Sequence, residues 1–453
     1  MKAEAIVAEI GSTTTVVTAF SGLNGSSPRI LGQAASPTTA TEGDVTCGLA
    51  QALKELGLSR EDLSQAAMMA TSSAAGGLKM TVHGLVHDMT VRAAREAALG
   101  AGAIVRYVTA GDITPADGDA ILAIRPSIIL LAGGVDHGER ATAVANARVL
   151  AGLGLTCPVV YAGNRAAAGE VRAVLARVGM EVRVVDNVYP RVDQLEVEPA
   201  RRAIQAVFER HITEAPGMGR VREIVKGTIL PTPGAVMRAA ELLYRDTGSG
   251  LLVIDVGGAT TDVHSVVEPS AEVAALLVNP EPLAKRTVEG DLGIVANAVH
   301  VAELLAAEDR TRLEERLRAP LESLLTEVAP FPTEPRQSAF ALALAGQAAR
   351  TALERHVGRY LHYYGPTGRL TVATGKDLGG VTLAIGTGGA FTRLEGGQEV
   401  LRKVLGRPTG LELWPREARA VIDRDYVMAA AGVLARSHPR AAIGLLLNSI
   451  GEG

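Results

Sequence analysis

The sequence is poor in cysteine and in aromatic residues. Its 453 residues include two cysteines, Cys47 and Cys157, and one tryptophan, and aromatic side chains make up 3% of the chain. The two cysteines are far apart and show no metal-ligand spacing, so we expect both to be buried thiols in a reducing compartment. An iron–sulfur cluster needs cysteine ligands for which the chain offers no plausible pair, which disfavours an electron-transfer role.

Long hydrophobic runs and a strong charge imbalance are also missing. No uninterrupted apolar stretch approaches the ~20 residues that span a bilayer. Glu4 and Glu9 interrupt the N-terminal apolar run, which argues against a secretory signal. The net charge of −4 gives no overall basic character, so nucleic acid is not an expected partner. We expect a cytoplasmic protein without membrane association, and the length predicts more than one domain.

One strand-turn-strand pattern occurs twice in the chain. Residues 6–17 read IVAEIGSTTTVV, and residues 252–263 read LVIDVGGATTDV. When the two are aligned, Glu9 falls on Asp255 and Gly11 falls on Gly257. Strands and helices alternate over much of the remaining sequence, as in doubly wound α/β proteins. The repetition predicts two halves that are built alike, with a site between them.

Each copy carries the groups needed to hold a phosphate chain. A buried strand ends in a carboxylate, a glycine then allows close approach of the backbone, and small hydroxyl residues offer further donors. A single copy is equally well explained as an ordinary β-hairpin turn, and the second copy favours the phosphate site. The candidate phosphate-binding residues are Gly11, Ser12, Thr13 and Thr14 in the first turn and Gly257, Gly258, Ala259, Thr260 and Thr261 in the second.

A weaker second repetition involves paired glycines. The apolar run at residues 126–132 leads into Gly133-Gly134, and the run at residues 381–387 leads into Gly388-Gly389. We interpret these as equivalent strands of the two halves, although two unrelated strand ends capped by glycine are an alternative. A glycine ribbon that includes Gly386 would let a flat base lie where no side chain blocks it.

These motifs, in this order and spacing, resemble those of the actin-like ATPase superfamily. The resemblance assigns Glu9–Thr15 as the phosphate-1 motif, Asp255–Asp262 as phosphate-2 and Ile385–Phe391 as the adenosine motif. It implies an α/β fold of two duplicated RNase H-like domains with a nucleotide cleft between them. Glu9 departs from the usual Asp of the first motif by one methylene, which leaves open how it orients water and metal.

The sequence around the motifs is similar to that of the family called GlmL or MutL. This family shares its name with an unrelated mismatch-repair protein. The segments that carry this similarity are AEIGSTTT, LLAGGVD, DVGGATTD, VEGDLG and TGKD, beginning at residues 8, 130, 255, 288 and 374. The resemblance implies an ATP-driven chaperone that helps an adenosylcobalamin-dependent glutamate mutase or aminomutase exchange damaged cobalamin. It implies ATP or ADP and Mg²⁺ as cofactors and mutase subunits as partners, with a homo-oligomer possible.

The charged residues receive roles on the same basis. We expect Asp255 and Glu9 to hold Mg²⁺ through water, and Glu9 to position the attacking water, because phosphoryl transfer gains most from alignment and charge stabilisation. Asp262 is a second catalytic candidate, and a plain surface position on the return strand is an equal alternative for it. Asp291 is expected to contact the nucleotide or to cap a helix.

Two other functions remain open at this point. A small-molecule kinase of the same superfamily would transfer phosphate to a metabolite, and it would need a base and an acceptor pocket in the cleft. A nucleotide-gated assembly protein would instead sediment in a nucleotide-dependent manner. The sequence does not identify the mutase, the oligomeric state or the partner-binding surface.

The chain is expected to divide into a first half at residues 1–190, a helical connector at 191–247 and a second half at 248–453. Thr232 followed by Pro233 is expected to cap a connector helix. Long helices are predicted at 294–317 and 337–364, and Gly290-Asp291 is predicted to open a helix. The helix predicted at 337–364 places Tyr360, Tyr363 and Tyr364 at helical spacing, where core packing is more usual than a partner contact. The last ~40 residues are expected to be helical and to pack on the first domain.

Overall fold

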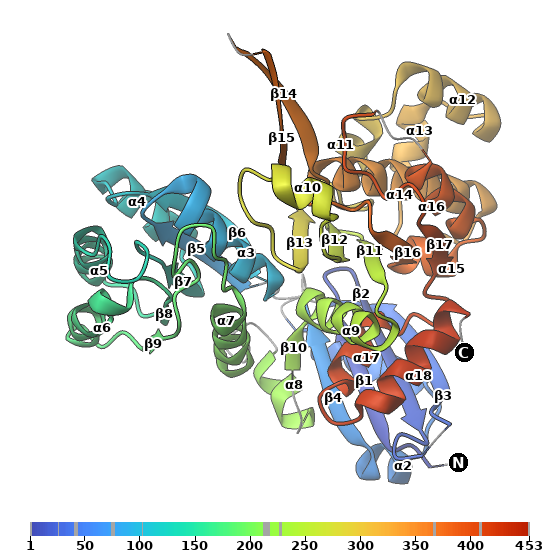
Figure 1. Cartoon of the computed structure of the whole chain (residues 1–453). Helices are drawn as coiled ribbons and strands as arrows, with labels where there is room; N and C mark the ends of the chain where they lie inside the picture. The colour runs from blue at the N-terminus through green and yellow to red at the C-terminus, as the bar shows by residue number, and fades with distance from the viewer. Residues whose placement is uncertain are drawn as a thin grey trace.

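The computed structural model describes residues 2–25, 27–39, 44–73, 78–101, 103–211, 218–225, 229–365, 368–406 and 410–451. Three five-stranded sheets and one two-stranded sheet carry the architecture of these residues (Figure 1). Helices cover the sheets, and both described ends of the chain lie near the first sheet. None of the helices in the described part of the chain is long and apolar enough to cross a membrane.

The first sheet contains the first copy of the repeated pattern. Its strand order is β10-β4-β1-β2-β3, with β2 antiparallel to both neighbours and β1, β4 and β10 parallel. Its members are β1 (Ala5–Ile10), β2 (Thr14–Ser21), β3 (Arg29–Pro37), β4 (Ala67–Ser72) and β10 (Ile229–Pro231), with helices α1 (Thr46–Glu55) and α2 (Arg60–Gln65) beside them.

The second sheet repeats this order with the second copy of the pattern. The order β13-β12-β11-β16-β17 again has two antiparallel contacts followed by two parallel ones. Its members are β11 (Gly250–Val256), β12 (Thr261–Val266), β13 (Ala284–Glu289), β16 (Val381–Thr387) and β17 (Arg419–Ile422). The prediction of two duplicated domains is therefore confirmed.

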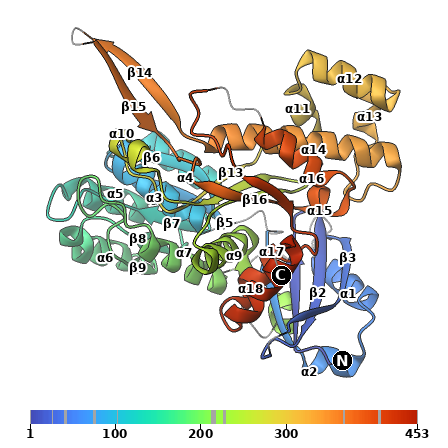
Figure 2. The ribbon, with the colours of Figure 1, turned by 45° about the vertical axis from the view of Figure 1, so that its right-hand side comes forward.

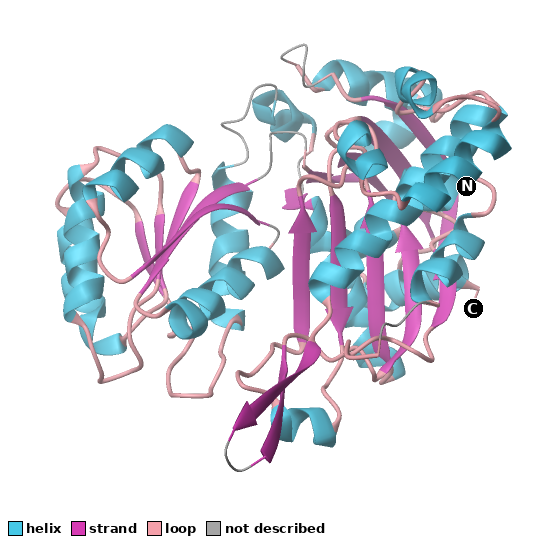
Figure 3. Cartoon of the chain, turned by 90° about the horizontal axis from the view of Figure 1, so that it is seen from above, coloured by secondary structure: helices cyan, strands magenta, loops and turns pink. Residues whose placement is uncertain are grey.

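The third sheet is entirely parallel, with the order β6-β5-β7-β8-β9. Figure 3 shows helices on both of its faces, as expected when strands are buried from both sides. Its strands are β5 (Leu78–Gly84), β6 (Ala103–Ala110), β7 (Ile128–Leu131), β8 (Val159–Tyr161) and β9 (Val182–Val184). Its helical segments are η2 (His87–Val91), α3 (Arg92–Gly100), α4 (Pro115–Ile124), α5 (Ala141–Gly152), η3 (Arg165–Ala167) and α6 (Ala168–Ala176).

The equivalence proposed for the paired glycines is wrong. Gly133-Gly134 follow β7 in the third sheet, whereas the strand that occupies the place of β16 in the first sheet is β4. An apolar strand followed by glycines is common to parallel sheets in general, so the pattern did not distinguish the two. Residues 1–190 accordingly hold strands of two sheets, and the segment 191–247 contributes β10 to the first of them.

Helices from the middle and from the C-terminal part of the chain pack together between the two like domains. The segment before the second sheet forms α7 (Glu198–His211), α8 (Met218–Ile224) and α9 (Thr232–Thr247). The C-terminal helices α17 (Met428–Leu434) and α18 (Pro439–Ile450) pack against α9 on the first domain, as predicted. A Cβ at Gly432 would lie 1.8 Å from the Ala235 carbonyl oxygen, so α17 and α9 cross in direct backbone contact.

Two long helices predicted in the second half are shorter than expected. The first is replaced by α11 (Ala298–Glu303) and α12 (Ala307–Leu317), because residues 294–297 form a turn bonded to the second phosphate-type loop. The second ends at His356 as α14 (Pro335–His356) and is followed by the hairpin β14 (Arg359–Gly365) and β15 (Gly368–Thr374). Aromatic and β-branched residues favour strand over helix there. The other second-half helices are α10 (Ala271–Leu276), α13 (Leu321–Thr326), α15 (Gly389–Arg393) and α16 (Gly397–Leu405).

Two smaller expectations also fail. Gly290 and Asp291 lie in a turn after β13 and open no helix. Helix α9 begins at Thr232 itself, with Pro231 at the N-cap position and no side-chain cap, so Thr232 is not the capping residue.

Candidate functional site

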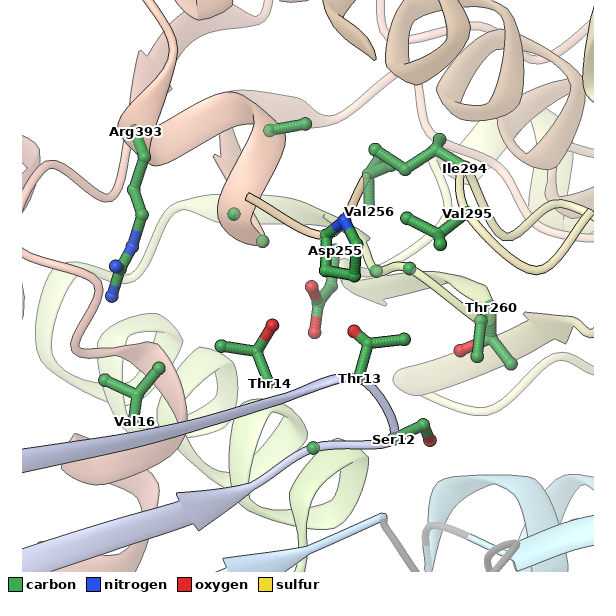
Figure 4. A pocket seen from close by; sticks show the side chains of 18 of the residues that line it. Ser12, Thr13, Thr14, Val16, Asp255, Val256, Thr260, Ile294, Val295 and Arg393 are labelled. Carbon is green, nitrogen blue, oxygen red and sulfur yellow. The ribbon is translucent and has the colours of Figure 1, made fainter. Parts of the chain in front are cut away.

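The two repeated turns line one cavity between the first and second sheets. The cavity has a volume of about 280 Å³, close to the lower end of ordinary ligand pockets. Figure 4 shows Thr13 and Thr14 from the first turn opposite Asp255 on the second sheet. Of the predicted site residues, those that line the cavity are Glu9, Gly11, Ser12, Thr13, Thr14, Asp255, Gly257, Gly258, Ala259, Thr260, Asp262, Gly388 and Gly389.

The same hydrogen bond closes both turns. The Gly11 N–H donates to the Thr14 carbonyl at 2.9 Å, and the Gly257 N–H donates to the Thr260 carbonyl at 2.9 Å. A Cβ at Gly11 would lie 2.6 Å from the Thr14 oxygen, so glycine is required for this closure. The repetition in the sequence therefore corresponds to a repetition of local geometry.

The turns also approach each other closely across the cavity. A Cβ at Gly258 would lie 2.7 Å from the Thr13 hydroxyl oxygen. The backbone at Gly258 is further held by Val295, whose N–H donates to the Gly258 carbonyl at 2.9 Å. Donor groups of the two like domains are thus brought to opposite sides of one small space.

Carboxylates concentrate at this cavity. Removal from water raises the pKa of Asp255 well above its ordinary value, and the nearby carboxylates of Asp262 and Glu9 raise it further. Removal from water likewise raises the pKa of Glu9 to about 7, against a hydrogen bond from Tyr426 that lowers it. Such a group favours a bound cation, because a cation compensates several negative charges at once.

Asp262 is paired rather than exposed on the return strand. It is 5% exposed, and Arg286, which is 1% exposed, donates from Nε and Nη2 to its Oδ1 at 2.9 and 2.6 Å. Arg286 also donates from Nη1 to the Leu99 carbonyl at 2.9 Å, in the last turn of α3. The arginine thus ties a carboxylate of the cavity to the domain of the third sheet.

Two residues at the cavity come from segments that sequence reasoning did not connect with it. The Tyr426 hydroxyl donates to Glu9 Oε1 at 3.0 Å, although the two residues lie at opposite ends of the chain. Arg393 lines the cavity, with its guanidinium carbon 5.6 Å from the centre of the Tyr426 ring. Neither residue belongs to a recognisable motif, so no local signal could have found them.

Asp423 holds the segment that carries Tyr426. Its carboxylate accepts hydrogen bonds from the backbone N–H groups of Val427 and Met428 at 3.0 Å, from Ser449 at 2.6 Å and from Thr387 at 3.0 Å. Burial raises the pKa of Asp423, and these donors oppose the rise. The donors join the end of β16 to the start of α17.

Thr232 adds an unpaired hydroxyl to the cavity wall. It stands at the first position of α9, is 6% exposed, and its Oγ1 has no hydrogen-bond partner among the residues that the structure describes. A buried hydroxyl without a partner costs free energy unless a ligand or water satisfies it. The uncapped helix end beside it also favours negative charge.

The predicted adenosine strand contributes two of its three glycines to the cavity. A Cβ at Gly386 would meet the side chains of Ile422 and Leu401, so Gly386 serves packing. Gly388 has φ of +90°, and a Cβ there would lie 2.2 Å from the Val256 carbonyl oxygen. A side chain at Gly389 would instead enter open space. The cavity wall is completed by apolar residues, among them Ile294, Pro330, Phe331 and Pro332.

Besides Gly386, two predicted residues lie outside the cavity lining. Thr261 is fully buried, and its hydroxyl donates to the Leu292 carbonyl at 2.7 Å. Asp291 is ion-paired with Arg355, which donates from Nη1 and Nη2 at 2.8 and 2.9 Å, and lies 3.1 Å from His300 Nε2. The hydrogen bond from Arg355 holds the pKa of Asp291 below its ordinary value.

Comparison with known proteins supplies independent information. The family model described as "MutL protein" matches residues 5–450. "Protein MutL" of Clostridium tetanomorphum is 37% identical over 458 residues, which cover 97% of this chain and 98% of that protein.

Solved structures resemble the chain more remotely. A nucleotide-free acetone carboxylase is 13% identical with a TM-score of 0.40, covering 96% of this chain and 70% of that one. A diol dehydratase-reactivating factor, also nucleotide-free, is 12% identical with a TM-score of 0.36, covering 96% of this chain and 100% of that one.

Proposed function

The chain belongs to the MutL family, and we propose on this basis that it is an ATP-dependent reactivating chaperone for an adenosylcobalamin-dependent glutamate mutase or aminomutase. It binds ATP or ADP with Mg²⁺ in the cavity between the two like domains. It then uses hydrolysis to promote exchange of damaged cobalamin in the mutase.

One observation carries the nucleotide part of this proposal. Two turns closed by the same hydrogen bond face each other across a cavity that also holds Glu9, Asp255 and Asp262. Backbone donors on opposite sides suit a phosphate chain, which needs many N–H groups and close approach of the backbone. The apolar wall around Phe331 and the open face of Gly389 leave a place for a flat base.

The carboxylates fit a magnesium ion held mainly through its waters. Mg²⁺ keeps several waters and binds through one or two carboxylates in phosphate sites. Burial raises the pKa values of Asp255 and Glu9, and neighbouring carboxylates raise them further, whereas Asp262 is already paired with Arg286. A bound ion would draw charge from the phosphate oxygens and make both carboxylates fully ionised.

Glu9, Tyr426 and Thr232 would act on water near the terminal phosphate. The hydrogen bond from Tyr426 fixes the orientation of the Glu9 carboxylate, which offsets the freedom of its additional methylene. Glu9 accepts a proton or orients an attacking water, and the unpaired Thr232 hydroxyl binds a phosphate oxygen or that water.

The proposal is tested by coupling two measurements. Purified protein with Mg²⁺ and ATP is mixed with a mutase inactivated by damaged cobalamin, while phosphate release and cobalamin release are followed together. We expect cobalamin release to require hydrolysis. Phosphate transfer to a metabolite would instead support a kinase, and hydrolysis without release from glutamate mutase or aminomutases would refute the chaperone role.

A further inference from the structure

The hairpin of β14 and β15 stands apart from the rest of the described molecule. Its two strands pair only with each other as a sheet, and the ribbon projects away from the body in Figures 1 and 2. An isolated two-stranded hairpin is only marginally stable in water. The arrangement of side chains on the projecting part of this ribbon therefore requires an explanation other than the stability of the hairpin itself.

One face of the hairpin anchors it to the protein. Tyr360 and Ala373 are opposite each other in the register and belong to a small apolar cluster with Val273 and Leu413. The same side of the ribbon continues outward with His362 opposite Thr371, which lie 3.0 Å apart from His362 Nδ1 to Thr371 Oγ1. This face is packed at the base and polar beyond it.

The other face is apolar beyond Arg359 and Thr374, and no hydrophobic cluster of the described residues includes its apolar side chains. Side chains alternate between faces along a strand, so the pairs Leu361–Val372 and Tyr363–Leu370 lie together on this side. Tyr363 is 55% exposed and Leu370 is 62% exposed. Large apolar side chains gathered on one projecting face indicate an interaction site.

Exposed apolar residues continue at the base of the hairpin. Val278 is 55% exposed and donates its N–H to the Ala373 carbonyl, and Leu411 is 49% exposed and accepts from the Tyr360 N–H. Val278 therefore extends the apolar surface beyond β15, whereas Leu411 is opposite Tyr360 and lies on the anchored side; both are outside the residues that line the nucleotide cavity.

The charges of the hairpin indicate which kind of surface its apolar face binds. Residues 359–374 include Arg359 on the apolar side of the ribbon and His362 and Arg369 on the other side, but no aspartate or glutamate. Symmetric pairing with a second copy would bring these cationic strands together, which is unfavourable. An apolar surface bordered by carboxylates would complement both the apolar face and the arginines.

We infer that the apolar face of this hairpin, centred on Tyr363 and Leu370, is the docking surface for the mutase, and that the mutase presents an apolar patch edged by carboxylates. This rests on the proposed function. An aromatic side chain at the centre of an interface commonly carries much of the binding energy. The hairpin would then bind the mutase, while nucleotide binding and hydrolysis take place in the separate cavity between the two like domains.

The test replaces both side chains in a Tyr363→Thr, Leu370→Thr variant, because threonine keeps the preference for strand. The matched control is Val178→Thr, since Val178 is 53% exposed and lies outside the hairpin and the cavity. Mutase affinity is measured by biolayer interferometry, hydrolysis without mutase by phosphate release, and oligomeric state by sedimentation equilibrium. A further variant, Arg369→Glu, tests the charge with the apolar face intact.

We expect the double variant to weaken mutase binding ~10-fold or more, with hydrolysis in the absence of mutase unchanged and the control equal to wild type. Arg369→Glu should also weaken binding, and the dependence on salt should decrease. Wild-type affinity in the double variant and in Arg369→Glu would overturn the docking surface while leaving the proposed function standing. Failure of the wild-type protein to bind either class of mutase would refute both. A change of oligomeric state in the double variant would assign the face to a second copy instead.

Discussion

The pairing of Arg286 with Asp262 leads to a quantitative prediction for the second domain. Replacing Arg286 by methionine keeps much of the volume but removes every donor that faces Asp262 from β13. Asp262 is then left with the Thr260 hydroxyl at 3.3 Å, beside Asp255. Breaking a buried pair in this way costs about 3–5 kcal/mol, because one charge remains buried without compensation.

Arg355 supplies a matched comparison. It pairs with Glu289 and Asp291, but its side chain is 39% exposed, so water screens these interactions. Exposed pairs contribute about 0–1 kcal/mol. We therefore expect Arg355→Met to lower the free energy of unfolding by less than about 1 kcal/mol.

Trp414 allows the second domain to be followed separately. It is the single tryptophan of the chain, is 3% exposed in the core of that domain, and donates from Nε1 to the Leu405 carbonyl. Urea unfolding monitored by its fluorescence should show the larger loss for Arg286→Met. Adding Asp262→Leu to Arg286→Met should recover most of the loss, since both charges are then absent. Equal stability of the Arg286→Met and Arg355→Met variants would refute the reasoning.

Three further predictions concern the cavity and the third sheet. Gly389→Leu should abolish nucleotide binding, measured by fluorescence anisotropy of a labelled ATP analogue, because its side chain enters the cavity; Gly169→Leu, in the open first turn of α6, should bind like wild type. Thr232→Val should lower ATP hydrolysis ~10-fold, the value of about one hydrogen bond to a charged group, whereas Thr232→Ser should retain it; equal rates in the two would contradict a role for the hydroxyl. His83 is fully buried between Thr81 and Thr109, and burial lowers its pKa to about 4 from 6.5. The unfolded state then binds more protons between these values, so stability should fall by about 3 kcal/mol as pH drops from 6.5 to 4. His83→Gln should show less of this dependence in pH-dependent urea unfolding, and an unchanged profile would exclude His83 as its source.

Local patterns predicted the parts of the site that lie within one hairpin. A strand, a carboxylate, a glycine and hydroxyls stand next to each other in sequence, so the turns at Gly11 and Gly257 could be found without a structure. The repeated turn also predicted that the whole sheet is duplicated. In the structure, the two strands joined by each turn occupy equivalent positions in the strand orders of the first and second sheets.

Contacts between distant segments could not be predicted in this way. Tyr426 reaches Glu9 only because α17 packs back on the first domain, and Arg286 reaches Asp262 only through the pairing of β12 with β13. The sequence predicts a helix over β14 because apolar spacing in a short run fits both structures, and the strand preference of the aromatic and β-branched residues produces a hairpin instead.

Gly388 shows why a site residue needs its surroundings. Steric blocking of a base by a side chain at this position is a natural expectation from sequence. In the structure, however, that side chain would first collide with the backbone of Val256, and φ of +90° would add strain. Loss of binding in a Gly388 variant would therefore not distinguish blocking from misfolding, whereas Gly389 makes the distinction.

The central claim is that the carboxylates between the two like domains hold a magnesium–nucleotide complex. The most direct measurement is calorimetric titration of ATP with and without Mg²⁺ into the wild-type protein and Asp255→Asn, which preserves shape and removes charge. We predict Mg²⁺-dependent binding to the wild-type protein and affinity weakened ~10-fold or more in Asp255→Asn. The stability of the nucleotide-free variant should not decrease, because a repelled carboxylate is removed. Equal Mg²⁺-dependent affinity for both proteins would contradict the claim.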